Sequence, residues 1–340
     1  MNEVSTDTLL EVDDLHVKFF TRRGTAHAIR GVSMRIGRGE TLGLVGESGS
    51  GKSVTSLAIM GLIQLPGRIT GGDVRWKGTS VIGDGGARYI RRIRGKEMAM
   101  VFQDPMTSLN PLFTIGTQIG EVLKHHMGMH RQESRERTVE LLELVRISSP
   151  EKRVDQYPHE FSGGMRQRML IAMALACEPE LLIADEPTTA LDVTIQAQIL
   201  ELLAELQQRL RIAVLLISHD LGVVAQVCHR VSVMYAGHIV ESGAAEDVFE
   251  RPGHPYTRGL LASTPRLDQI GSRLTGIDGS PPDLVKPPGG CPFHPRCSLV
   301  VDRCSEEMPP LEEHEPGREV ACWRAFAGSV GEAAGAGAIG

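Results

Sequence analysis

Eight consecutive residues form a pattern suited to holding a phosphate chain. Positions 46–53 read GESGSGKS and fit G-x-x-x-x-G-K-[ST], between a short apolar run and a helical pattern. Phosphates need converging backbone N–H groups, which glycine-rich turns supply, and a helix N-terminus behind the loop. They also need a lysine for the outer phosphates and a hydroxyl for Mg²⁺. The candidate phosphate-binding residues are Gly46, Glu47, Ser48, Gly49, Ser50, Gly51, Lys52 and Ser53.

Two acids end a second apolar run, LLIADE at positions 181–186. A carboxylate at the carboxyl end of a strand lies at the sheet edge where phosphate loops sit. We therefore expect Asp185 to hold Mg²⁺ and Glu186 to polarise an attacking water. Two such acids alone are often solvated turn residues, so the upstream phosphate loop is what favours a functional role.

Two further positions have the chemistry to meet an anion. Ser162, Gly163 and Gly164 precede an amphipathic run, and a serine at a helix start with free N–H groups makes an anion site without lysine. An ordinary helix cap is the alternative. His219 follows the apolar run 212–217, where an imidazole could contact a γ-phosphate, although a lone histidine there is more often structural.

The hydrophobic pattern indicates an α/β fold around these residues. Residues 9–20 and 31–36 alternate as antiparallel strands, and the sequence strand, glycine loop, helix over 41–63 begins a parallel α/β unit. Further buried strands are expected at 181–184 and 212–217. An amphipathic helix over 195–210 and a hairpin over 231–241 complete the expected core.

Composition changes divide the chain. Helical patterns from about 104 to 177 indicate a helical subdomain inserted in the core, so that 1–245 forms one domain. Pro- and Gly-rich sequence then introduces an extension, 246–327, and the Gly/Ala-rich residues 328–340 are expected to be disordered.

Charge and hydropathy limit the partners and the location. Acids outnumber bases 42 to 36, and the formal net charge of −6 argues against nucleic acid as a partner. No uncharged stretch is apolar and long enough to span a bilayer, and the acidic N-terminus lacks the apolar core of a secretory signal. We therefore expect a cytoplasmic protein that reaches a membrane only through a partner.

The ordered motifs resemble those of the ATP-binding subunit of ABC transporters, over about residues 9–243. They are GESGSGKS, Gln103, FSGGM, LLIADE, Ala190-Leu191-Asp192 and His219. The resemblance implies a P-loop NTPase fold, with a RecA-like α/β core, an antiparallel β part and a helical subdomain. It also implies two subunits that enclose ATP between them, where Ser162–Gly164 of one closes over the phosphate loop of the other.

The same resemblance implies roles for single residues. Gln103 would sense Mg²⁺ and couple to the permease, and Glu186 would be the general base. Asp192 would line the dimer seam, and His219 would read the γ-phosphate. Phe19 would stack on adenine, with Phe20 equally available, and ATP rather than GTP is implied by the family alone.

A narrower group is indicated by FSGGMRQR, HDLGVV and HPYT (His254–Thr257), which look like the D-type ATPase of dipeptide/oligopeptide importers. That group implies a heterodimer with a second ATPase, two transmembrane permease subunits and an extracytoplasmic solute-binding protein, at the cytoplasmic face of the membrane. Met165 stands where the family signature has glutamine, and methionine cannot make the hydrogen bonds of glutamine.

Four cysteines crowd the extension: Cys291, Cys297, Cys304 and Cys322. A segment this small buries too little apolar surface to fold alone, and four thiolates suit an iron–sulfur cluster or Zn²⁺. The absence of close C-x₂-C pairs weakens the zinc interpretation. The arrangement resembles the C-terminal extension of peptide-importer ATPases, in which a [4Fe–4S] cluster can occur, so we expect that cluster, with Zn²⁺, unliganded thiols or disulfides as alternatives.

The sequence as a whole predicts an ATPase subunit that powers dipeptide or oligopeptide import. A soluble ABC ATPase acting on ribosomes or DNA is disfavoured, because there is one phosphate loop and no long heptad pattern. An importer ATPase for another solute, and a non-catalytic module in which the cysteines sense redox state, remain as alternatives.

Overall fold

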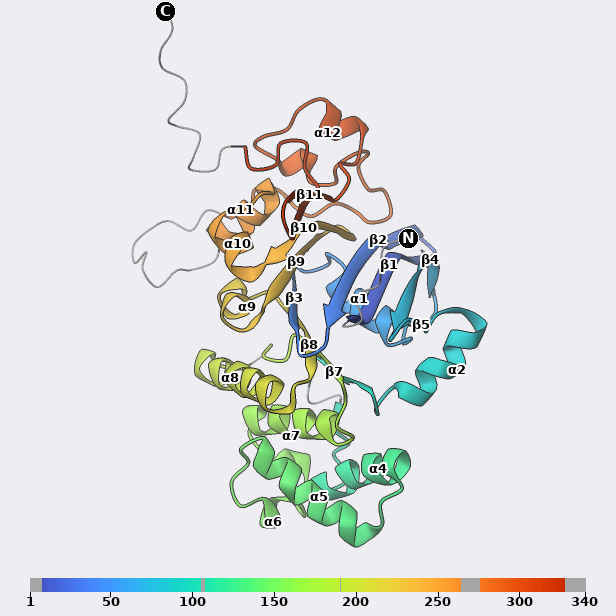
Figure 1. The fold of residues 1–340 in the computed structure, drawn as a ribbon, viewed down its shortest axis with the longest axis vertical. Coiled ribbons are helices and arrows are strands. Elements are labelled where there is room, and N and C mark those ends of the chain that lie inside the picture. The colour runs from blue at the N-terminus through green and yellow to red at the C-terminus, as the bar shows by residue number, and fades with distance from the viewer. Residues whose placement is uncertain (1–7, 105–107, 190, 264–275, 328–340) are drawn as a thin grey trace, which may run out of the picture.

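A largely parallel β-sheet forms the centre of the chain, and a smaller antiparallel sheet stands beside it (Figure 1). The computed structural model describes residues 8–104, 108–189, 191–263 and 276–327. The strands are β1 (Thr8–Thr21), β2 (Gly24–Gly37), β3 (Thr41–Val45), β4 (Gly67–Trp76), β5 (Thr79–Ser80), β6 (Met98–Val101), β7 (Leu181–Asp185), β8 (Ala213–Ser218), β9 (Arg230–Tyr235), β10 (His238–Ala244), β11 (Glu312–Glu315) and β12 (Arg318–Val320).

Helices connect these strands. They are α1 (Lys52–Ile59), α2 (Gly83–Ile93), α4 (Ile115–Met127), α5 (Arg131–Leu144), α6 (Pro150–Arg153), α7 (Gly163–Leu175), α8 (Val193–Leu210), α9 (Leu221–Val227), α10 (Ala245–Glu250), α11 (Pro255–Ala262) and α12 (Arg303–Glu306). Two 3-10 turns, η1 (Pro158–Glu160) and η2 (His294–Arg296), are also present.

The main sheet has the strand order β11-β12-β10-β9-β3-β8-β7-β6. Its five strands from β9 to β6 are mutually parallel, and every residue of β3, β7 and β8 is buried. Such strands are largely apolar because helices cover both faces of a parallel sheet. The parallel arrangement brings the carboxyl ends of β3, β6, β7 and β8 to one edge, which is where the site lies.

The second sheet, β2-β1-β4-β5, is antiparallel, as the alternating pattern near the N-terminus predicted. The hairpin between its long strands β1 and β2 turns at Arg22 and Arg23. Apolar side chains of β1, β2 and β4 share a core with α1, for example Leu15, Ile29 and Ile59. This core fixes the position of α1, and therefore of the loop in front of it.

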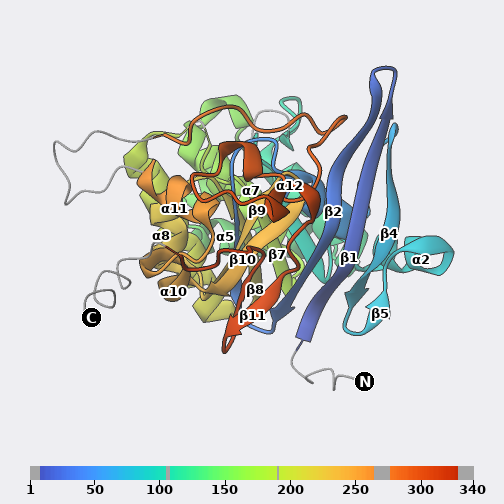
Figure 2. The ribbon, with the colours of Figure 1, turned by 90° about the horizontal axis from the view of Figure 1, so that it is seen from above.

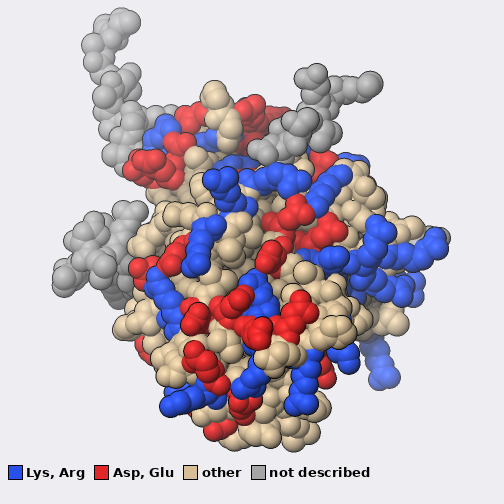
Figure 3. Space-filling view, turned by 60° about the horizontal axis from the view of Figure 1, so that its bottom comes forward, with Lys and Arg blue, Asp and Glu red and all other residues tan. Residues whose placement is uncertain are grey.

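Helices α4 to α7 form the helical part at the lower end of Figure 1. Thr114 begins α4 by accepting a hydrogen bond from the Thr117 N–H, and Leu123 and Leu142 bury the faces of α4 and α5 that meet. Figure 3 shows basic and acidic side chains interspersed over the face of the molecule that carries this end.

The C-terminal region continues the main sheet instead of forming the separate cysteine-rich module that we expected. β12 pairs with β10 in antiparallel fashion, and Glu241 of β10 lies opposite Val320. A buried ion pair joins Arg318 Nη2 to Glu241 Oε1 at 3.1 Å. Figure 2 shows this region lying across β9 and β10. The tail 328–340, expected to be disordered, lies outside the described residues.

Over the residues for which the structure gives a placement, no helix combines the length and the apolar character that crossing a bilayer requires.

Candidate functional site

The phosphate loop joins the carboxyl end of β3 to the start of α1. Gly46, Gly49 and Gly51 all have positive φ, and a Cβ on Gly46 would overlap the carbonyl oxygen of Met234. These positions therefore require glycine. Helix α1 begins after Gly51 without a side-chain cap, so its first N–H groups point into the loop. The loop has the form that converging phosphate oxygens need.

Lys52 lies inside this loop. Its Nζ donates to the carbonyl oxygen of Gly46 at 2.7 Å and to that of Glu47 at 3.0 Å. Burial lowers the pKa of Lys52, although the carboxylates of Glu186 and Asp185 oppose that effect. The ammonium group is thus bound to two neutral carbonyl oxygens, which phosphate oxygens could replace when a nucleotide binds.

The last residue of β7 faces the first turn of α1. Ser53 Oγ donates to Asp185 Oδ1 at 3.0 Å, and Ser56 Oγ lies 3.5 Å from Asp185 Oδ2. Asp185 is buried, and desolvation raises its pKa. A hydroxyl and a carboxylate are the hard oxygen ligands that Mg²⁺ prefers, with phosphate oxygens and water completing its shell. The donor set at Ser53 and Asp185 therefore fits Mg²⁺.

Glu186 is the meeting point of three strand ends. Its Oε2 accepts a hydrogen bond from Gln103 Nε2 at 2.9 Å and lies 3.6 Å from His219 Nδ1. Gln103 follows β6, Glu186 follows β7 and His219 follows β8, so the parallel sheet brings together three residues that the sequence separates widely. Gln103 contacts Glu186 here, whereas Ser53 and Asp185 pair with each other.

Thr189 is a member of this cluster that the sequence analysis missed. Its hydroxyl donates to Glu186 Oε2 at 2.9 Å. The contact is possible because Glu186 has a φ of 45°, which turns the chain back on itself directly after β7. The run DEPTT offered a signal, because a threonine three residues after an acid can close such a turn.

The serine–glycine motif lies at the start of α7. Ser162 Oγ accepts from the Met165 N–H at 3.4 Å, and Asp192 Oδ1 accepts from the Ile195 N–H at 3.0 Å at the start of α8. The two helix starts adjoin, since a Cβ on Gly164 would lie 2.6 Å from Ile195 Cγ2. Ser162, Gly163, Gly164 and Asp192 thus gather in one place, on elements different from those of the phosphate loop.

The aromatic residues at the end of β1 differ in environment. Phe19 packs near Gly67, where an added Cβ would lie 2.7 Å from Phe19 Cε1, and contributes to the core of the antiparallel part. Phe20 is 49% exposed. The two rings therefore offer one partly buried and one open aromatic surface.

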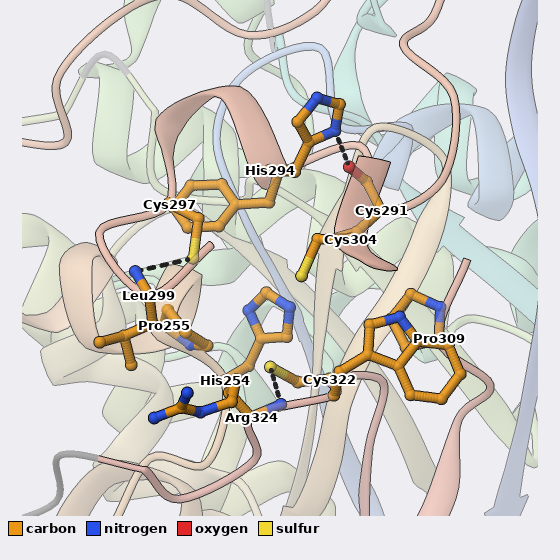
Figure 4. Close-up of a pocket in the computed structure, with 12 residues that line it drawn as sticks. His254, Pro255, Cys291, His294, Cys297, Leu299, Cys304, Pro309, Cys322 and Arg324 are labelled. Carbon is orange, nitrogen blue, oxygen red and sulfur yellow. Dashed lines mark hydrogen bonds between the residues drawn. The ribbon is translucent and has the colours of Figure 1, made fainter. Parts of the chain in front are cut away.

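The predicted [4Fe–4S] cluster is wrong, and so is its zinc alternative. Cys291, Cys297, Cys304 and Cys322 line one small pocket with His254 (Figure 4). Nevertheless, nowhere in the described part of the chain do three or more His, Cys, Asp or Glu residues form a group that could hold a metal ion. Burial raises the pKa of Cys291 to about 11, which favours the neutral thiol, whereas metals bind thiolates.

The physical reason for this error lies in how the extension is stabilised. The expectation of a metal rested on a segment that had to fold alone. Instead, the Phe293 ring contacts the rings of Tyr235 and Tyr256, and the Glu241 carboxylate accepts from the N–H groups of Gly253 and His254 at 2.7 and 2.9 Å. Packing against the rest of the protein therefore stabilises the extension, and a metal site is not needed for that purpose.

Comparison with known proteins identifies the family. The family model for ABC transporters matches residues 29–189, and the model for the C-terminal region of oligopeptide/dipeptide transporters matches residues 240–304. The dipeptide transport ATP-binding protein DppD of Bacillus subtilis (strain 168) is 52% identical over 320 residues, which are 93% of this chain and 95% of the relative. The oligopeptide transport ATP-binding protein OppD of Salmonella typhimurium is 51% identical over 318 residues, 94% of each chain.

Solved structures agree with this result. The protein cbiO1 of Clostridium perfringens, part of an ABC transporter complex, has a TM-score of 0.61 at 29% identity over 72% of this chain and 92% of its own. A dimeric ATP-binding cassette in a post-hydrolysis state with ADP and Pi has a TM-score of 0.62 at 26% identity, covering 70% of this chain and 99% of that one. The predicted P-loop fold is confirmed. The chain belongs to the ABC transporter family, among the ATP-binding proteins that carry the oligopeptide/dipeptide transporter C-terminal region.

Proposed function

We propose that this chain hydrolyses ATP to power the import of dipeptides or oligopeptides through an ABC transporter. The observation that carries the proposal is the meeting of Gln103, Glu186 and His219 at the sheet edge where the phosphate loop and Asp185 also lie. Relatives named for dipeptide and oligopeptide transport, at 52% and 51% identity, support the cargo.

The residues divide the work at the nucleotide. Residues 46–53 cradle the phosphates, and Lys52 exchanges its two carbonyl partners for phosphate oxygens. Ser53 and Asp185, which are hydrogen-bonded to each other here, would hold Mg²⁺, and Gln103 would respond to it. When bound, Mg²⁺ supplies positive charge that offsets the charge of the phosphates. Phe19, or Phe20 beside it, stacks on the adenine ring.

Glu186 acts as the general base that orients the attacking water and accepts its proton. Gln103 and Thr189 hold its carboxylate by hydrogen bonds, and His219 stands beside it to contact the γ-phosphate. All three of these contacts are made by Glu186 Oε2. None of them uses Oε1, the second carboxylate oxygen, which suits an oxygen that must receive a proton.

The second half of each ATP site comes from another subunit. Ser162 caps α7, Gly163 and Gly164 are its first two residues, and Asp192 caps the adjoining α8. We assign these residues to the γ-phosphate of ATP on a paired ATPase, which in the D-type group is a different chain. A dimeric cassette among the similar solved structures supports this arrangement.

The proposed assembly contains the two ATPases and two transmembrane permease subunits, served by an extracytoplasmic solute-binding protein. This chain then lies at the cytoplasmic face of the membrane, attached through the permease. Residues 1–245 form the nucleotide-binding domain, with its helical subdomain at about 104–177, and residues 246–327 form the extension.

The test is reconstitution of the whole transporter in proteoliposomes. We expect Mg²⁺-dependent ATP hydrolysis and ATP-dependent uptake of a labelled dipeptide or tetrapeptide, both strongly reduced by Glu186→Gln in this chain. Uptake that continues without ATP hydrolysis would overturn the coupling. Hydrolysis with no peptide uptake, but uptake of another solute, would overturn the cargo.

A further inference from the structure

The C-terminal region reaches back to the phosphate loop through one arginine. Arg296, in η2, directs its guanidinium at Glu47, the second residue of the loop. Nη1 donates to Oε2 at 2.7 Å and Nη2 donates to Oε1 at 3.0 Å. Parallel bonds of this kind are stronger and more directional than a single ion pair. The Arg296 side chain is only 5% exposed, so water does not screen the pair well.

Arg296 is itself held in place by acceptors on its other edges. Nε donates to the carbonyl oxygen of Asp278 at 2.9 Å, and Nη2 also donates to that of Ile277 at 3.2 Å. Nη1 lies 3.2 Å from the hydroxyl oxygen of Tyr235. The guanidinium therefore has one orientation, and the hydrogen bond to Glu47 raises the pKa of Arg296.

A second residue of the C-terminal region binds the backbone of the same loop residue. The Glu47 N–H donates to the hydroxyl oxygen of Tyr256 at 2.8 Å. Burial raises the pKa of Tyr256, so its phenol stays neutral. Glu47 thus has its N–H and its carboxylate fixed by residues beyond 250, while its carbonyl oxygen accepts from Lys52 Nζ at 3.0 Å.

This arrangement matters because the loop is rich in residues of high conformational freedom. Three of its residues are glycines at positive φ, which have more conformational freedom than other residues. A loop that is ordered before the ligand arrives loses less entropy on binding. In addition, the extension contacts the neighbouring strand, because the His27 N–H donates to the carbonyl oxygen of Leu284 at 2.9 Å. The loop and β2 are thereby held to one segment.

We propose that Arg296 is a positioning residue for nucleotide binding, which holds Glu47 so that the phosphate loop keeps the conformation that receives ATP. The C-terminal region then sets the affinity of the nucleotide-binding domain for ATP. This inference rests on the proposed function, since it takes ATP as the ligand of the loop.

The experiment measures MgATP binding to the full-length chain by calorimetry. We expect Arg296→Gln to weaken the affinity about tenfold. Arg296→Lys should recover part of the affinity, because lysine keeps the charge but cannot make the two parallel hydrogen bonds to the carboxylate. Glu47→Gln should weaken it to a similar extent, and the double variant should be no weaker than the weaker single variant, because both remove one contact. Arg251→Gln is the control: it removes exposed ion pairs to Asp247 and Glu315 in the same region, away from the loop.

Kinetics in the assembled transporter separate positioning from mere stability. A positioning role raises the KM for ATP and leaves kcat nearly unchanged, whereas partial unfolding lowers kcat at constant KM. Unchanged affinity in Arg296→Gln, or additive losses in the double variant, would overturn the inference. If Arg296→Gln does not fold, Tyr256→Phe takes its place, with an expected loss of about threefold and unchanged affinity as the contrary result. A wild-type chain that fails to bind MgATP would overturn the proposed function first.

Discussion

Gln103 Nε2 and Glu186 Oε2 lie 2.9 Å apart, and this hydrogen bond ties the end of β6 to the end of β7. Gln103 stands at the point where the chain leaves the sheet for the helical part. The orientation of the Glu186 carboxylate therefore depends on how the helical part sits against the sheet. A movement of that part would break or redirect the bond, and a partner that contacts the helical part would thereby act on the proposed base.

Replacement of the base should separate binding from turnover. Glu186→Gln keeps the size of the side chain and an oxygen that can accept from Thr189, but it cannot accept a proton. We expect MgATP affinity to stay within about threefold, and phosphate release to fall by about 100-fold or more. Phosphate release by the assembled transporter is the measurement, and an unaltered rate in this variant would refute the assignment of Glu186.

Asp185→Asn should stabilise the nucleotide-free protein and should also remove the Mg²⁺ dependence of ATP hydrolysis. Burial raises the pKa of Asp185 above its unfolded value, so the group costs stability as the pH rises through the unfolded pKa, and the cost is complete above the raised pKa. Asparagine relieves this cost while still accepting a hydrogen bond from Ser53. We expect the Tm of the nucleotide-free protein to rise in Asp185→Asn. Ser53→Ala is the control: it should also remove the Mg²⁺ dependence of ATP hydrolysis, but its Tm should not rise. A lower Tm in Asp185→Asn would contradict the prediction.

Stability should fall in mild acid because of buried histidines. Burial lowers the pKa of His254 and of His238 to about 3. Both are neutral in the folded chain and bind a proton only on unfolding, so stability is full above pH 6.5 and is lost as the pH falls towards 3. Each contributes a slope of about 1.4 kcal/mol per pH unit.

His254→Asn isolates one of these protons. Asparagine retains a side-chain acceptor for the Tyr256 N–H, to which His254 Nδ1 is bonded at 3.0 Å. Chemical denaturation between pH 7 and pH 5 should show a shallower loss of stability in the variant, by about one proton. Parallel curves for the two proteins would show that His254 does not titrate on unfolding.

Ser162 offers a matched pair of variants. Ser162→Ala removes the cap of α7 and should cost about 1 kcal/mol, whereas Ser162→Asp keeps an acceptor for the Met165 N–H. Both should bind MgATP as isolated chains, because the phosphate loop is intact. In the assembled transporter both should lose hydrolysis at the ATP site that Ser162 completes. Ser162→Ala removes the hydroxyl assigned to the γ-phosphate, and Ser162→Asp places negative charge against it. Normal hydrolysis by Ser162→Asp would remove these residues from the composite site.

The features predicted correctly from the sequence are those that a contiguous stretch of residues determines. The buried strands β3, β7 and β8 are short apolar runs, and the phosphate loop with Lys52 and Ser53 is a single stretch of eight residues. Asp185 and Glu186 were found because they directly follow such a run. Thr189 was missed because its contact depends on the backbone conformation of Glu186, which no residue pattern displays.

Contacts between distant parts of the chain account for the rest. The sequence of the extension shows prolines, glycines and cysteines, and these predicted a self-contained metal module. What stabilises it instead are pairs that the sequence separates widely, Glu241 with Arg318 and Glu47 with Arg296. A composition argument cannot detect partners outside the segment to which it is applied.

The pairing of β12 with β10 has a practical consequence for anyone who shortens or exchanges parts of this protein. A chain that ended at residue 245 would expose the backbone of β10 as an unprotected sheet margin, inviting aggregation. It would also strand the Glu241 carboxylate without its cation. A chimera that uses the ATP-binding portion must therefore also include residues 246–327, since the two parts depend on each other for a complete sheet.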